Sequence, residues 1–488
     1  MDGRKADSDP AARDGLSRRH FLELLGLGSA GVVLGSCSSG TGSAGGGGHK
    51  GSSTTTTTVP SFPLGASQKA SGVVTVTMWH SMTSANLSTL QTLVRQFNAS
   101  QSKIVVKLLG QASYTDTFTA YRTALTSPST LPAIVQIQSI SLQDMIDSRS
   151  IVPAAAALRA DTSFDASDVI PAASNYFTVN GIQYAMPWNC SAQIMYYNKK
   201  TFASAGLDPS KPPVSFAEYH DMSAQLKSRA ALPYGTAIKL TSSNVEDWVA
   251  KAGALMLNNS NGRHGRATAV EFGGSVGKQV MSFLSDMFSS KLAEATIATN
   301  YDNLLAIANG SVAMAIETSA ALGTVLKIIG GGQYHNVTLG VGPIPGIDGP
   351  GDGVPYGGAG LYIVKDRSPE EQDAAWQFIK FLLSPSAMTT WAIGSGYIPI
   401  TRSATETAAM KKEWSDTPQM RVAYEEIAST KPNVATAGAV SGALAQIETD
   451  VQNAMSEISN GTSPTSALAS AVSAGNQAIS AYNSSVGG

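Results

Sequence analysis

The chain has 488 residues and a formal net charge of -2, and charged residues make up only 14% of it. This length is too great for one compact core, so two or more domains are expected, and the absence of a basic excess argues against nucleic acid or an anionic membrane surface as a partner. The two cysteines, Cys37 and Cys190, are far apart, which gives neither metal-ligand spacing nor a disulfide framework.

The N-terminus has the pattern of an export signal. Residues 17–22 (SRRHFL) read as a twin-arginine signal, and the apolar run 24–34 that follows is too short to span a bilayer. Residues 34–37 (LGSC) resemble a lipobox, which predicts a signal over 1–36 and a lipid on Cys37. We therefore expect a lipoprotein on the outer face of the cytoplasmic membrane, with plain secretion and nearby cleavage as the alternative.

Residues 37–72 are of low complexity, with a glycine tract at 46–48 and a threonine tract at 54–58. Such a composition has too little apolar surface to offset the entropy of ordering. The pattern predicts a flexible stalk that links the lipid to a folded part starting near residue 73.

The folded part opens with alternating strands and helices. Strands are predicted over 73–79, 104–109 and 133–138, and helices over 87–97 and 142–147. This rhythm favours an α/β fold with a mainly parallel sheet, whose ligands bind beyond the carboxyl ends of the strands. His80, Tyr114 and Ser139 lie near such ends.

The later chain is mostly helical, with a few interleaved strands. Helices are predicted over 216–227, 245–257, 276–288, 304–308 and 369–383, strands over 312–317, 337–341 and 361–364, and a helical tail from 405 to the end.

Residues 184–199 carry the most informative pattern. A strand-like run ends in a Pro-aromatic-Asn corner at 187–189, small polar residues follow, and a second apolar run contains Tyr196 and Tyr197. Aromatic faces beside amides and hydroxyls suit a ligand that has an apolar face and several hydroxyls. An ordinary strand-turn-strand with core tyrosines is the alternative.

This stretch resembles the hinge segment of family 1 extracellular solute-binding proteins of ABC importers, and is most similar to their glycerol-3-phosphate- and carbohydrate-binding branch. Other matches follow in the same order: 78–82 (MWHSM), 132–136 (PAIVQ), 205–209 (AGLDP), 309–314 (NGSVAM), 357–359 (GGA) and 396–401 (GYIPIT). The resemblance implies a two-lobe, type II periplasmic-binding-protein-like fold with three crossovers, near 188–193, 358–361 and 383–387. Lobe 1 would comprise 73–187 and 361–384, and lobe 2 would comprise 188–358 and 385–488.

The resemblance also implies ligand contacts. Residues that agree in type with the family's contacts are Tyr114, Ser191, Thr318, Gly358 and Tyr397. Ser139 stands where the family has a glutamate for hydroxyl groups, and Glu448 where it has an arginine for phosphate, with Arg402 as a possible substitute. Because a carboxylate repels a phosphate, a neutral sugar or polyol fits at least as well as glycerol 3-phosphate or a glycerophosphodiester.

Two tryptophans, Trp188 and Trp248, are candidate platforms for stacking on a sugar, with core packing as the alternative. Glu246, on the same predicted helix as Trp248, could accept hydroxyl protons. Cys190 reads as a small buried filler rather than a reactive thiol.

Motifs for catalysis are weak. Residues 273–277 (GGSVG) match G-x-S-x-G, but the pattern needs a preceding core strand and a downstream acid and histidine. The histidines have no metal-ligand spacing, so no cofactor or metal is expected. We expect a non-enzymatic, monomeric binding protein that delivers a sugar, polyol, glycerol 3-phosphate or glycerophosphodiester to ABC permease subunits. A surface hydrolase (glycosidase or esterase) and a receptor without a transport role are the alternatives.

Overall fold

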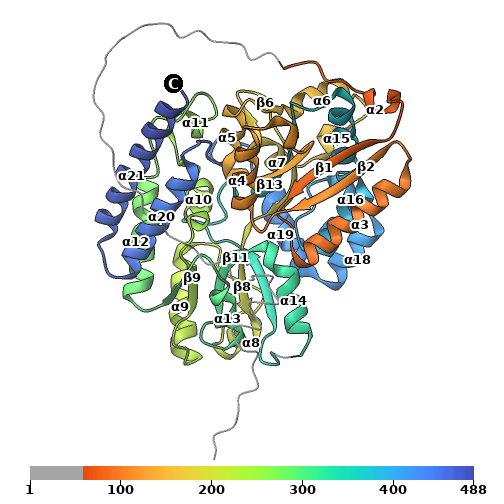
Figure 1. Ribbon diagram of the computed structural model, residues 1–488. Helices are drawn as coiled ribbons and strands as arrows, with labels where there is room; N and C mark the ends of the chain where they lie inside the picture. Colours follow the sequence, from red (N-terminus) through yellow and green to blue (C-terminus); the bar gives the residue numbers. More distant parts are fainter. Residues whose placement is uncertain (1–58, 333, 488) are drawn as a thin grey trace, which may run out of the picture.

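The structure is a computed structural model that describes residues 59–332 and 334–487. The predicted export signal over 1–36 and the predicted lipid site at Cys37 lie outside these residues. Two lobes are visible, each built on its own sheet (Figure 1).

The first lobe is built on a six-stranded sheet with the order β2-β1-β3-β13-β4, in which β7 also pairs with β13. Its strands are β1 (Val74–His80), β2 (Ile104–Gly110), β3 (Ile134–Gln138), β4 (Ile151–Val152), β7 (Met186–Ser191) and β13 (Gly357–Val364). β1 runs parallel to β2 and β3, whereas β13 is antiparallel to β3, β4 and β7. The short hairpin β5 (Thr178–Val179) and β6 (Ile182–Gln183) lies apart from this sheet.

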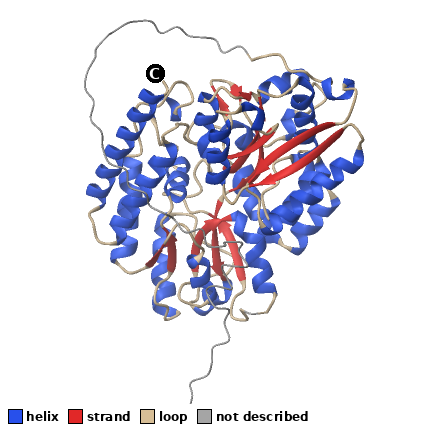
Figure 2. Ribbon diagram, viewed as in Figure 1, coloured by secondary structure: helices blue, strands red, loops and turns tan. Residues whose placement is uncertain are grey.

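Amphipathic helices cover this sheet (Figure 2). The helices of the first lobe are α2 (Ala66–Lys69), α3 (Ser84–Ser100), α4 (Tyr114–Ala124), α5 (Leu142–Asp147), α6 (Ala154–Ala160), α7 (Pro171–Tyr176), α15 (Pro369–Leu382) and α16 (Pro385–Ser395). In α3 the buried side chains Leu90, Leu93, Val94 and Phe97 recur at helical spacing. α15 begins with a capping box between Ser368 and Glu371 and has proline at its first position, which fixes its start.

The second lobe is built on a five-stranded sheet with the order β10-β9-β11-β8-β12. Its strands are β8 (Gln193–Asn198), β9 (Thr236–Lys239), β10 (Ala293–Thr296), β11 (Met314–Thr318) and β12 (Leu339–Pro343). Its helices are α8 (Lys199–Ser204), α9 (Phe216–Arg229), α10 (Ser242–Lys251), α11 (Asn258–Asn261), α12 (Ser275–Ser289), α13 (Asp302–Ala308), α14 (Leu322–Gly330), α20 (Leu444–Ser459) and α21 (Pro464–Ser485). α10, α12, α20 and α21 pack on one another beside the sheet (Figure 1).

The chain passes between the two sheets along short segments. β7 belongs to the first sheet and β8 to the second, and only Ala192 separates them. The chain returns to the first sheet over 344–356, between β12 and β13. α16 then packs on α3, whereas α19 (Pro418–Ala428) packs on β12, and α17 (Arg402–Thr405) and α18 (Ala408–Asp416) lie between them in the sequence.

Most predicted elements are present, with three differences. The helix predicted over 245–257 ends at Lys251, because the following turn places Gly253 at a positive φ of 69°. The helical tail is interrupted over 429–443. The described part of the expected stalk, residues 59–72, packs on the first lobe: Ser67 is fully buried, and its backbone N–H and hydroxyl donate to the Asp373 carboxylate of α15 at 2.9 Å and 2.5 Å.

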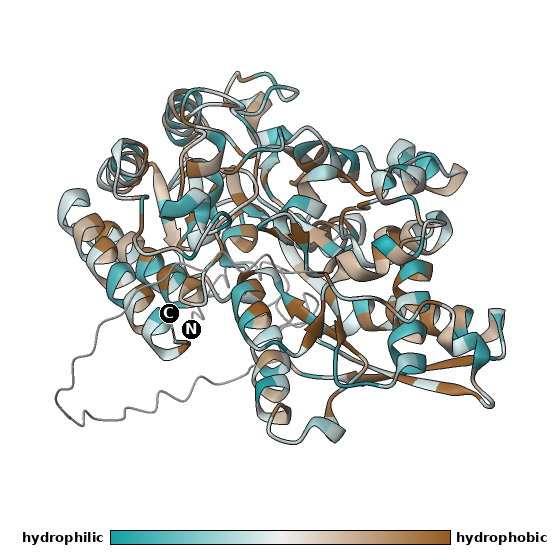
Figure 3. Cartoon of the chain, turned by 90° about the horizontal axis from the view of Figure 1, so that it is seen from above, coloured by the Kyte–Doolittle hydropathy of each residue, from teal (hydrophilic) through white to brown (hydrophobic). Residues whose placement is uncertain are grey.

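Apolar residues are concentrated on the strands, and the helices carry both polar and apolar residues (Figure 3). Among the described helices, none has the length and apolar character needed to cross a membrane.

The two lobes also touch through a charged contact away from the hinge strands. Asp147, the last residue of α5, forms an ion pair with Arg266, with an Nη1–Oδ2 distance of 2.9 Å, and accepts a hydrogen bond from the Tyr482 hydroxyl of α21 at 2.8 Å. We call Asp147, Arg266 and Tyr482 the interlobe latch. Arg263, close by in sequence, donates to the backbone carbonyls of Tyr176 and Thr178 in the first lobe and of Gly438 in the second.

Candidate ligand site

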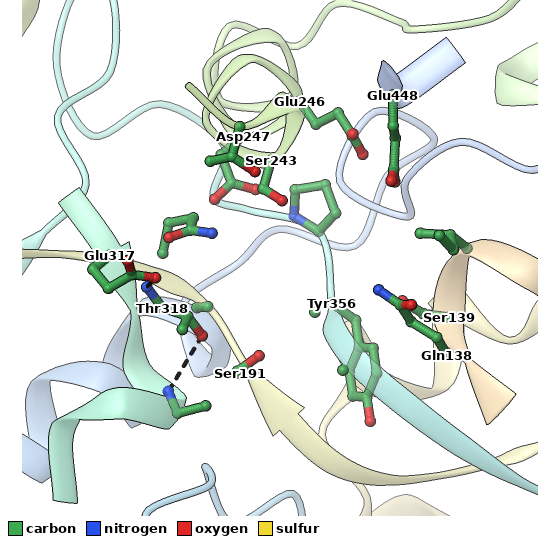
Figure 4. Close-up of a pocket in the computed structure, with 18 of the residues that line it drawn as sticks. Gln138, Ser139, Ser191, Ser243, Glu246, Asp247, Glu317, Thr318, Tyr356 and Glu448 are labelled. Carbon is green, nitrogen blue, oxygen red and sulfur yellow. Dashed lines mark hydrogen bonds between the residues drawn. The ribbon is translucent and has the colours of Figure 1, made fainter. Parts of the chain in front are cut away.

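A cavity of about 350 Å³ lies between the lobes. The first lobe contributes Tyr114, Gln138, Ser139, Ile140 and Tyr176, and the second contributes Lys239, Thr241, Ser243, Glu246, Asp247, Tyr301, Glu317, Thr318, Ala320 and Glu448. The segments that join the lobes supply Ser191, Ala192, Gln193, residues 355–358 and Tyr397. Figure 4 shows these side chains converging on one space from several elements. Because both lobes contribute to its wall, the shape of the cavity depends on how the lobes are placed.

The backbone of the cavity wall depends on glycine. Gly358 on β13 pairs with Cys190 on β7, and its φ is +118°. A Cβ atom at this position would lie 1.9 Å from the carbonyl oxygen of Asn189. A side chain is thus excluded both by the backbone conformation and by the close approach of the two strands.

Two tyrosines at the cavity are held by a buried hydrogen-bond chain. The Tyr114 hydroxyl lies 3.3 Å from the Tyr397 hydroxyl and accepts from the Asn189 side chain at 2.6 Å. Asn189 in turn accepts from Gln136 at 2.7 Å, and Gln136 accepts from the Ser81 backbone N–H at 2.9 Å. Burial raises the pKa of both tyrosines, so each keeps its proton. One proton bridges the two hydroxyls, and the other can be donated to a ligand oxygen.

A second cavity, of about 600 Å³, adjoins the first. Tyr114, Tyr301, Ala320 and Tyr397 line both, and residues from the start of α3 and from α14 line the second alone. The Tyr114–Tyr397 pair therefore stands between two connected compartments of one cleft.

The lysine that lines the first cavity is already paired. Lys239 Nζ lies 2.7 Å from Glu317 Oε2, and the side chains are 11% and 2% exposed. The same ammonium group lies 4.8 Å from the centre of the Tyr301 ring. Since the pair is mutually neutralised, Lys239 offers little free positive charge to a ligand.

Carboxylates gather at one end of the cavity. Glu246 and Asp247 project from α10, and Glu448 projects from α20 (Figure 4). Burial raises the pKa of Glu246 to about 7. Burial also raises the pKa of Glu448 and of Asp247 well above the usual range, and the charge of Glu246 adds to both shifts.

Six of the eight predicted ligand residues line this cavity. They are Tyr114, Ser139, Ser191, Thr318, Gly358 and Tyr397. They come from α4, the end of β3, β7, β11, β13 and the segment after α16, so the fold brings together residues that are nearly 300 positions apart. Their contact with a ligand remains a prediction.

The two tryptophans do not line either cavity, which corrects the expectation that they stack on a sugar. Trp188 is fully buried and stacks on Trp391, with ring centres 4.2 Å apart. Trp248 is fully buried and packs edge-to-face on Phe216. Both side chains point into the core, because the neighbouring polar residues of β7 and α10 take the cavity side.

Several cavity residues were not anticipated from the sequence. They are Lys239, Asp247, Tyr176, Tyr301, Glu317 and Tyr356. Lys239 and Glu317 lie at the carboxyl ends of neighbouring parallel strands, β9 and β11, which is where ligands of such sheets bind. Recognising the four-residue run Thr236–Lys239 as a strand would have identified Lys239.

The other residues considered from the sequence lie outside the cavity. The Arg402 guanidinium donates to the Ser167 backbone carbonyl, so it does not replace the phosphate arginine at the cavity. Ser275 of the G-x-S-x-G match is the first residue of α12, and only an isolated bridge at Val270 precedes it. Cys190 is fully buried in β7. No group of three or more His, Cys, Asp or Glu side chains in the described ranges could hold a metal ion.

Comparison with known proteins gives a consistent family. The profile described as bacterial extracellular solute-binding protein matches residues 92–422. The sn-glycerol-3-phosphate-binding periplasmic protein UgpB of Salmonella typhimurium is 26% identical over 413 residues, which cover 83% of this chain and 92% of that protein. UgpB of Yersinia pseudotuberculosis is 27% identical over 416 residues, covering 82% and 91%.

Solved structures share the fold. The cyclic alpha-maltosyl-1,6-maltose binding protein of Arthrobacter globiformis superposes with a TM-score of 0.68 at 22% identity, covering 84% of this chain and 99% of that one. UgpB of Mycobacterium tuberculosis, solved in complex with glycerophosphocholine, gives a TM-score of 0.67 at 20% identity with the same coverage. MalE of Xanthomonas citri gives 0.71 at 19% identity, covering 84% and 98%.

Proposed function

The chain belongs to the bacterial extracellular solute-binding protein family, and from this premise we propose that it captures a small polyhydroxylated solute for an ABC importer. The family match and the likeness to glycerol-3-phosphate-binding and sugar-binding proteins support this proposal. The protein would shift between open and closed states and break no bond in its solute.

The observation that carries the proposal is the interlobe cavity. Hydroxyl, amide and carboxylate groups alternate along its wall with the rings of five tyrosines: Tyr114, Tyr176, Tyr301, Tyr356 and Tyr397. Sugars and polyols present C–H faces to such rings and hydroxyls to such polar groups. The volume of the first compartment, about 350 Å³, falls within the range of small-molecule sites.

A neutral sugar or polyol fits this wall better than glycerol 3-phosphate does. Phosphate groups are held by bidentate arginine or by a helix N-terminus. Lys239 is the cation on the cavity wall, and it is paired with Glu317. On the family resemblance, the acidic Glu448 stands where an arginine would hold the phosphate. A phosphate dianion would therefore meet buried carboxyl groups and, among the described residues, no unpaired cation on the cavity wall.

Finer features belong to the same proposal. We propose the two predicted lobes with their bounds moved to 73–191 and 357–395 for lobe 1 and to 192–356 and 396–488 for lobe 2, because β7 and β13 belong to the first sheet and α16 packs on α3. Cys37 would carry the lipid that anchors a monomer outside the cytoplasmic membrane, and the closed lobes would dock on the permease subunits.

A thermal-shift screen of the full chain tests the function. The panel contains mono- and oligosaccharides, polyols, glycerol 3-phosphate and glycerophosphodiesters. A solute at about a hundred times its Kd stabilises the folded state by roughly 2.7 kcal/mol, which raises Tm visibly. Tyr397→Phe removes one hydroxyl at the cavity and keeps the ring, so it should weaken the shift without lowering the Tm of the free protein much.

Two results would count against the proposal. The first is the absence of a shift with every compound of the panel. The second is an equal shift in the wild type and in a variant that carries both Tyr397→Phe and Tyr114→Phe, because binding would then occur away from the cavity.

A further inference from the structure

The acidic end of the cavity contains two glutamates, Glu246 and Glu448, that form no ion pair with the described residues. Glu246 Oε1 is buried and has no hydrogen-bond partner among the described residues. Asp247 is 6% exposed and lines the same space. Glu448 reaches this end from α20, so its carboxylate faces that of Glu246 on α10 across two separate helices (Figure 4).

The nearest cation to this end is Lys251, which is already paired with Glu426 at 2.7 Å. Its charge and a hydrogen bond from the Gln193 backbone N–H offset part of the charge of Asp247, and they do not engage Glu246 or Glu448. Glu246 and Glu448 face each other and the Tyr176 hydroxyl. Among the described residues no ion pair within 4.0 Å engages Glu246, Asp247 or Glu448.

Two cations farther from Glu246 and Glu448 also have partners of their own. Lys239 is bonded to Glu317. The Arg263 guanidinium lies 5.4 Å from the centre of the Tyr176 ring and donates to backbone carbonyls of both lobes. Buried carboxylates of like sign repel one another, and each costs several kcal/mol to desolvate without a counter-charge. The empty cavity beside them is the place from which a counter-charge can come.

We propose that the solute carries a positively charged nitrogen, as a protonated amine or quaternary ammonium group on a hydroxylated skeleton, and that Glu246, Asp247 and Glu448 hold this group. The inference rests on the proposed function and names the substrate class of the same cavity. The hydroxyls of the skeleton would then lie toward the Tyr114 and Tyr397 side, and the nitrogen toward α10 and α20.

Proton linkage follows from the same arrangement. Burial raises the pKa of Glu246 to about 7, so part of this end is protonated in the free protein near neutral pH. A bound cation favours the ionised carboxylates, so binding releases protons. For a nitrogen that stays charged over the range, such as that of 3-amino-1,2-propanediol, the affinity should therefore rise between about pH 5.5 and pH 8, whereas the affinity for a neutral analogue should change little.

Matched pairs of probes test the proposal on the full chain by titration calorimetry. The pairs are glycerol with 3-amino-1,2-propanediol, glucose with glucosamine, and cellobiose with the glucosamine dimer, and N-acetylglucosamine serves as the amine with its charge removed. In at least one pair the amine should bind roughly thirtyfold more tightly than its neutral partner. Glu448→Gln and Glu246→Gln should each remove most of this preference.

A matched control separates the site from general charge effects. Glu425 is exposed on α19 and paired with Arg421, so Glu425→Gln changes the net charge equally and should leave the preference intact. The free protein supplies a second measurement. Because burial raises the pKa of Glu448, its carboxyl destabilises the folded state at a pH above its ordinary pKa, so Glu448→Gln should raise Tm at about pH 8, which also shows that the variant folds.

The outcomes separate the charged-nitrogen inference from the proposed function. Neutral or N-acetylated probes that bind as tightly as the amines overturn the charged-nitrogen inference and leave the proposed function standing. A Glu448→Gln variant with a lower Tm and equal losses for amines and neutral probes assigns the carboxylate a structural role and also overturns the inference. Failure of every polyhydroxylated probe, including those of the wider thermal-shift panel, removes the proposed function and the inference with it.

Discussion

Gly358 is a residue of the cavity wall that has no room for a side chain. Its φ of +118° strains any other residue, and the Asn189 carbonyl oxygen occupies the place of a Cβ atom. We expect Gly358→Ala to lower the free energy of unfolding by roughly 3 kcal/mol, since strain and overlap add, and to abolish solute binding. Urea unfolding and calorimetry measure the two effects.

Gly461 provides the control for Gly358. Its φ is +94°, but no heavy atom lies within 4 Å of a Cβ placed there. Gly461→Ala should therefore cost only about 1 kcal/mol and leave binding unchanged. Equal losses for the two substitutions would show that the contact with Asn189 is unimportant.

Glu246 predicts a pH dependence of stability. Its pKa is about 7 in the folded protein, above the ordinary value of 4.5, because burial disfavours the charged form. A carboxyl with a raised pKa binds more protons in the folded state, so its effect on the free energy of unfolding becomes more unfavourable as pH rises from about 4.5 to 7. As pH rises through this window, the Tm of Glu246→Gln should increase relative to the Tm of the wild type. Above about pH 7 the difference between the two Tm values should stay constant.

The comparison with Glu246→Gln is needed because other groups titrate in the same window. His80 is 1% exposed, and burial lowers its pKa to about 4, so its contribution to stability is lost as pH falls from about 6.5. The wild-type curve therefore combines opposing slopes, and only the difference between the two proteins reports Glu246. A difference that does not change with pH would contradict the prediction.

Single residues show where sequence reasoning succeeds and where it fails. Gly358 and Tyr397 were placed correctly at the cavity because each lies in a short motif that resembles the family's own. Trp188 and Trp248 were misplaced, since a large aromatic ring serves a core as well as a ligand platform, and only the packing around it decides. Asp247 could not be separated from the solvated carboxylates of other helices by pattern alone.

At the scale of elements, the interlobe latch joins α5 to α21. Asp147 is 12% exposed in its side chain and serves both Arg266 and Tyr482. If the latch forms only in the closed state, Asp147→Asn destabilises that state by about 1 kcal/mol, since Arg266 is partly exposed and the pair is screened. We expect a several-fold loss of affinity for any captured solute and a larger radius of gyration in solution scattering.

An exposed ion pair serves as the control for the latch. Lys412 and Asp416 form a pair along α18 with side chains 75% and 58% exposed. Asp416→Asn should change neither the affinity nor the scattering curve. Unchanged scattering and affinity for Asp147→Asn would mean that the latch does not bias closure.

Long amphipathic elements could be predicted from periodicity, and short ones could not. α3, α12 and α15 agree with the predicted helices to within a few residues, because each buries a stripe at helical spacing. β9 and β10 were missed, since four-residue strands contain too few alternations to exceed chance. Because β9 was not predicted, Lys239 at its end was not predicted as a cavity residue.

At the scale of the whole molecule, Cys190 reports on the integrity of the joint between the lobes. It is fully buried in β7, pairs with Gly358, and burial raises its pKa. In a Cys37→Ser chain, we expect a thiol reagent to label Cys190 only through opening of this joint. A bound solute at about a hundred times its Kd should slow labelling roughly a hundredfold if labelling needs the unliganded, opened state.

The labelling rate also has a clear contrary outcome. Fast labelling of the native chain, with no effect of solute, would mean that β7 and β13 separate readily without disturbing the cavity. Asn189→Ala, which breaks the chain from Gln136 to Tyr114, should speed labelling and serves as the positive control.

The overall architecture could be predicted because a βαβ rhythm and an ordered set of short motifs each constrain it independently. The two-lobe fold agrees with the structural neighbours. The charge of the cavity could not be predicted, because it depends on α10, α20 and β11 meeting in space, and α20 lies more than 100 positions from the other two.

The contact between Ser67 and Asp373 determines how a mechanical load would enter the molecule. Ser67 anchors the start of the described chain to α15 in the first lobe, far along the sequence from β7, β8 and β13. A pull transmitted through residue 59 would reach α2 and α15 and leave the strands that join the lobes outside the force path. The first lobe would stay fixed to the tether, and the second lobe would be free to move relative to it.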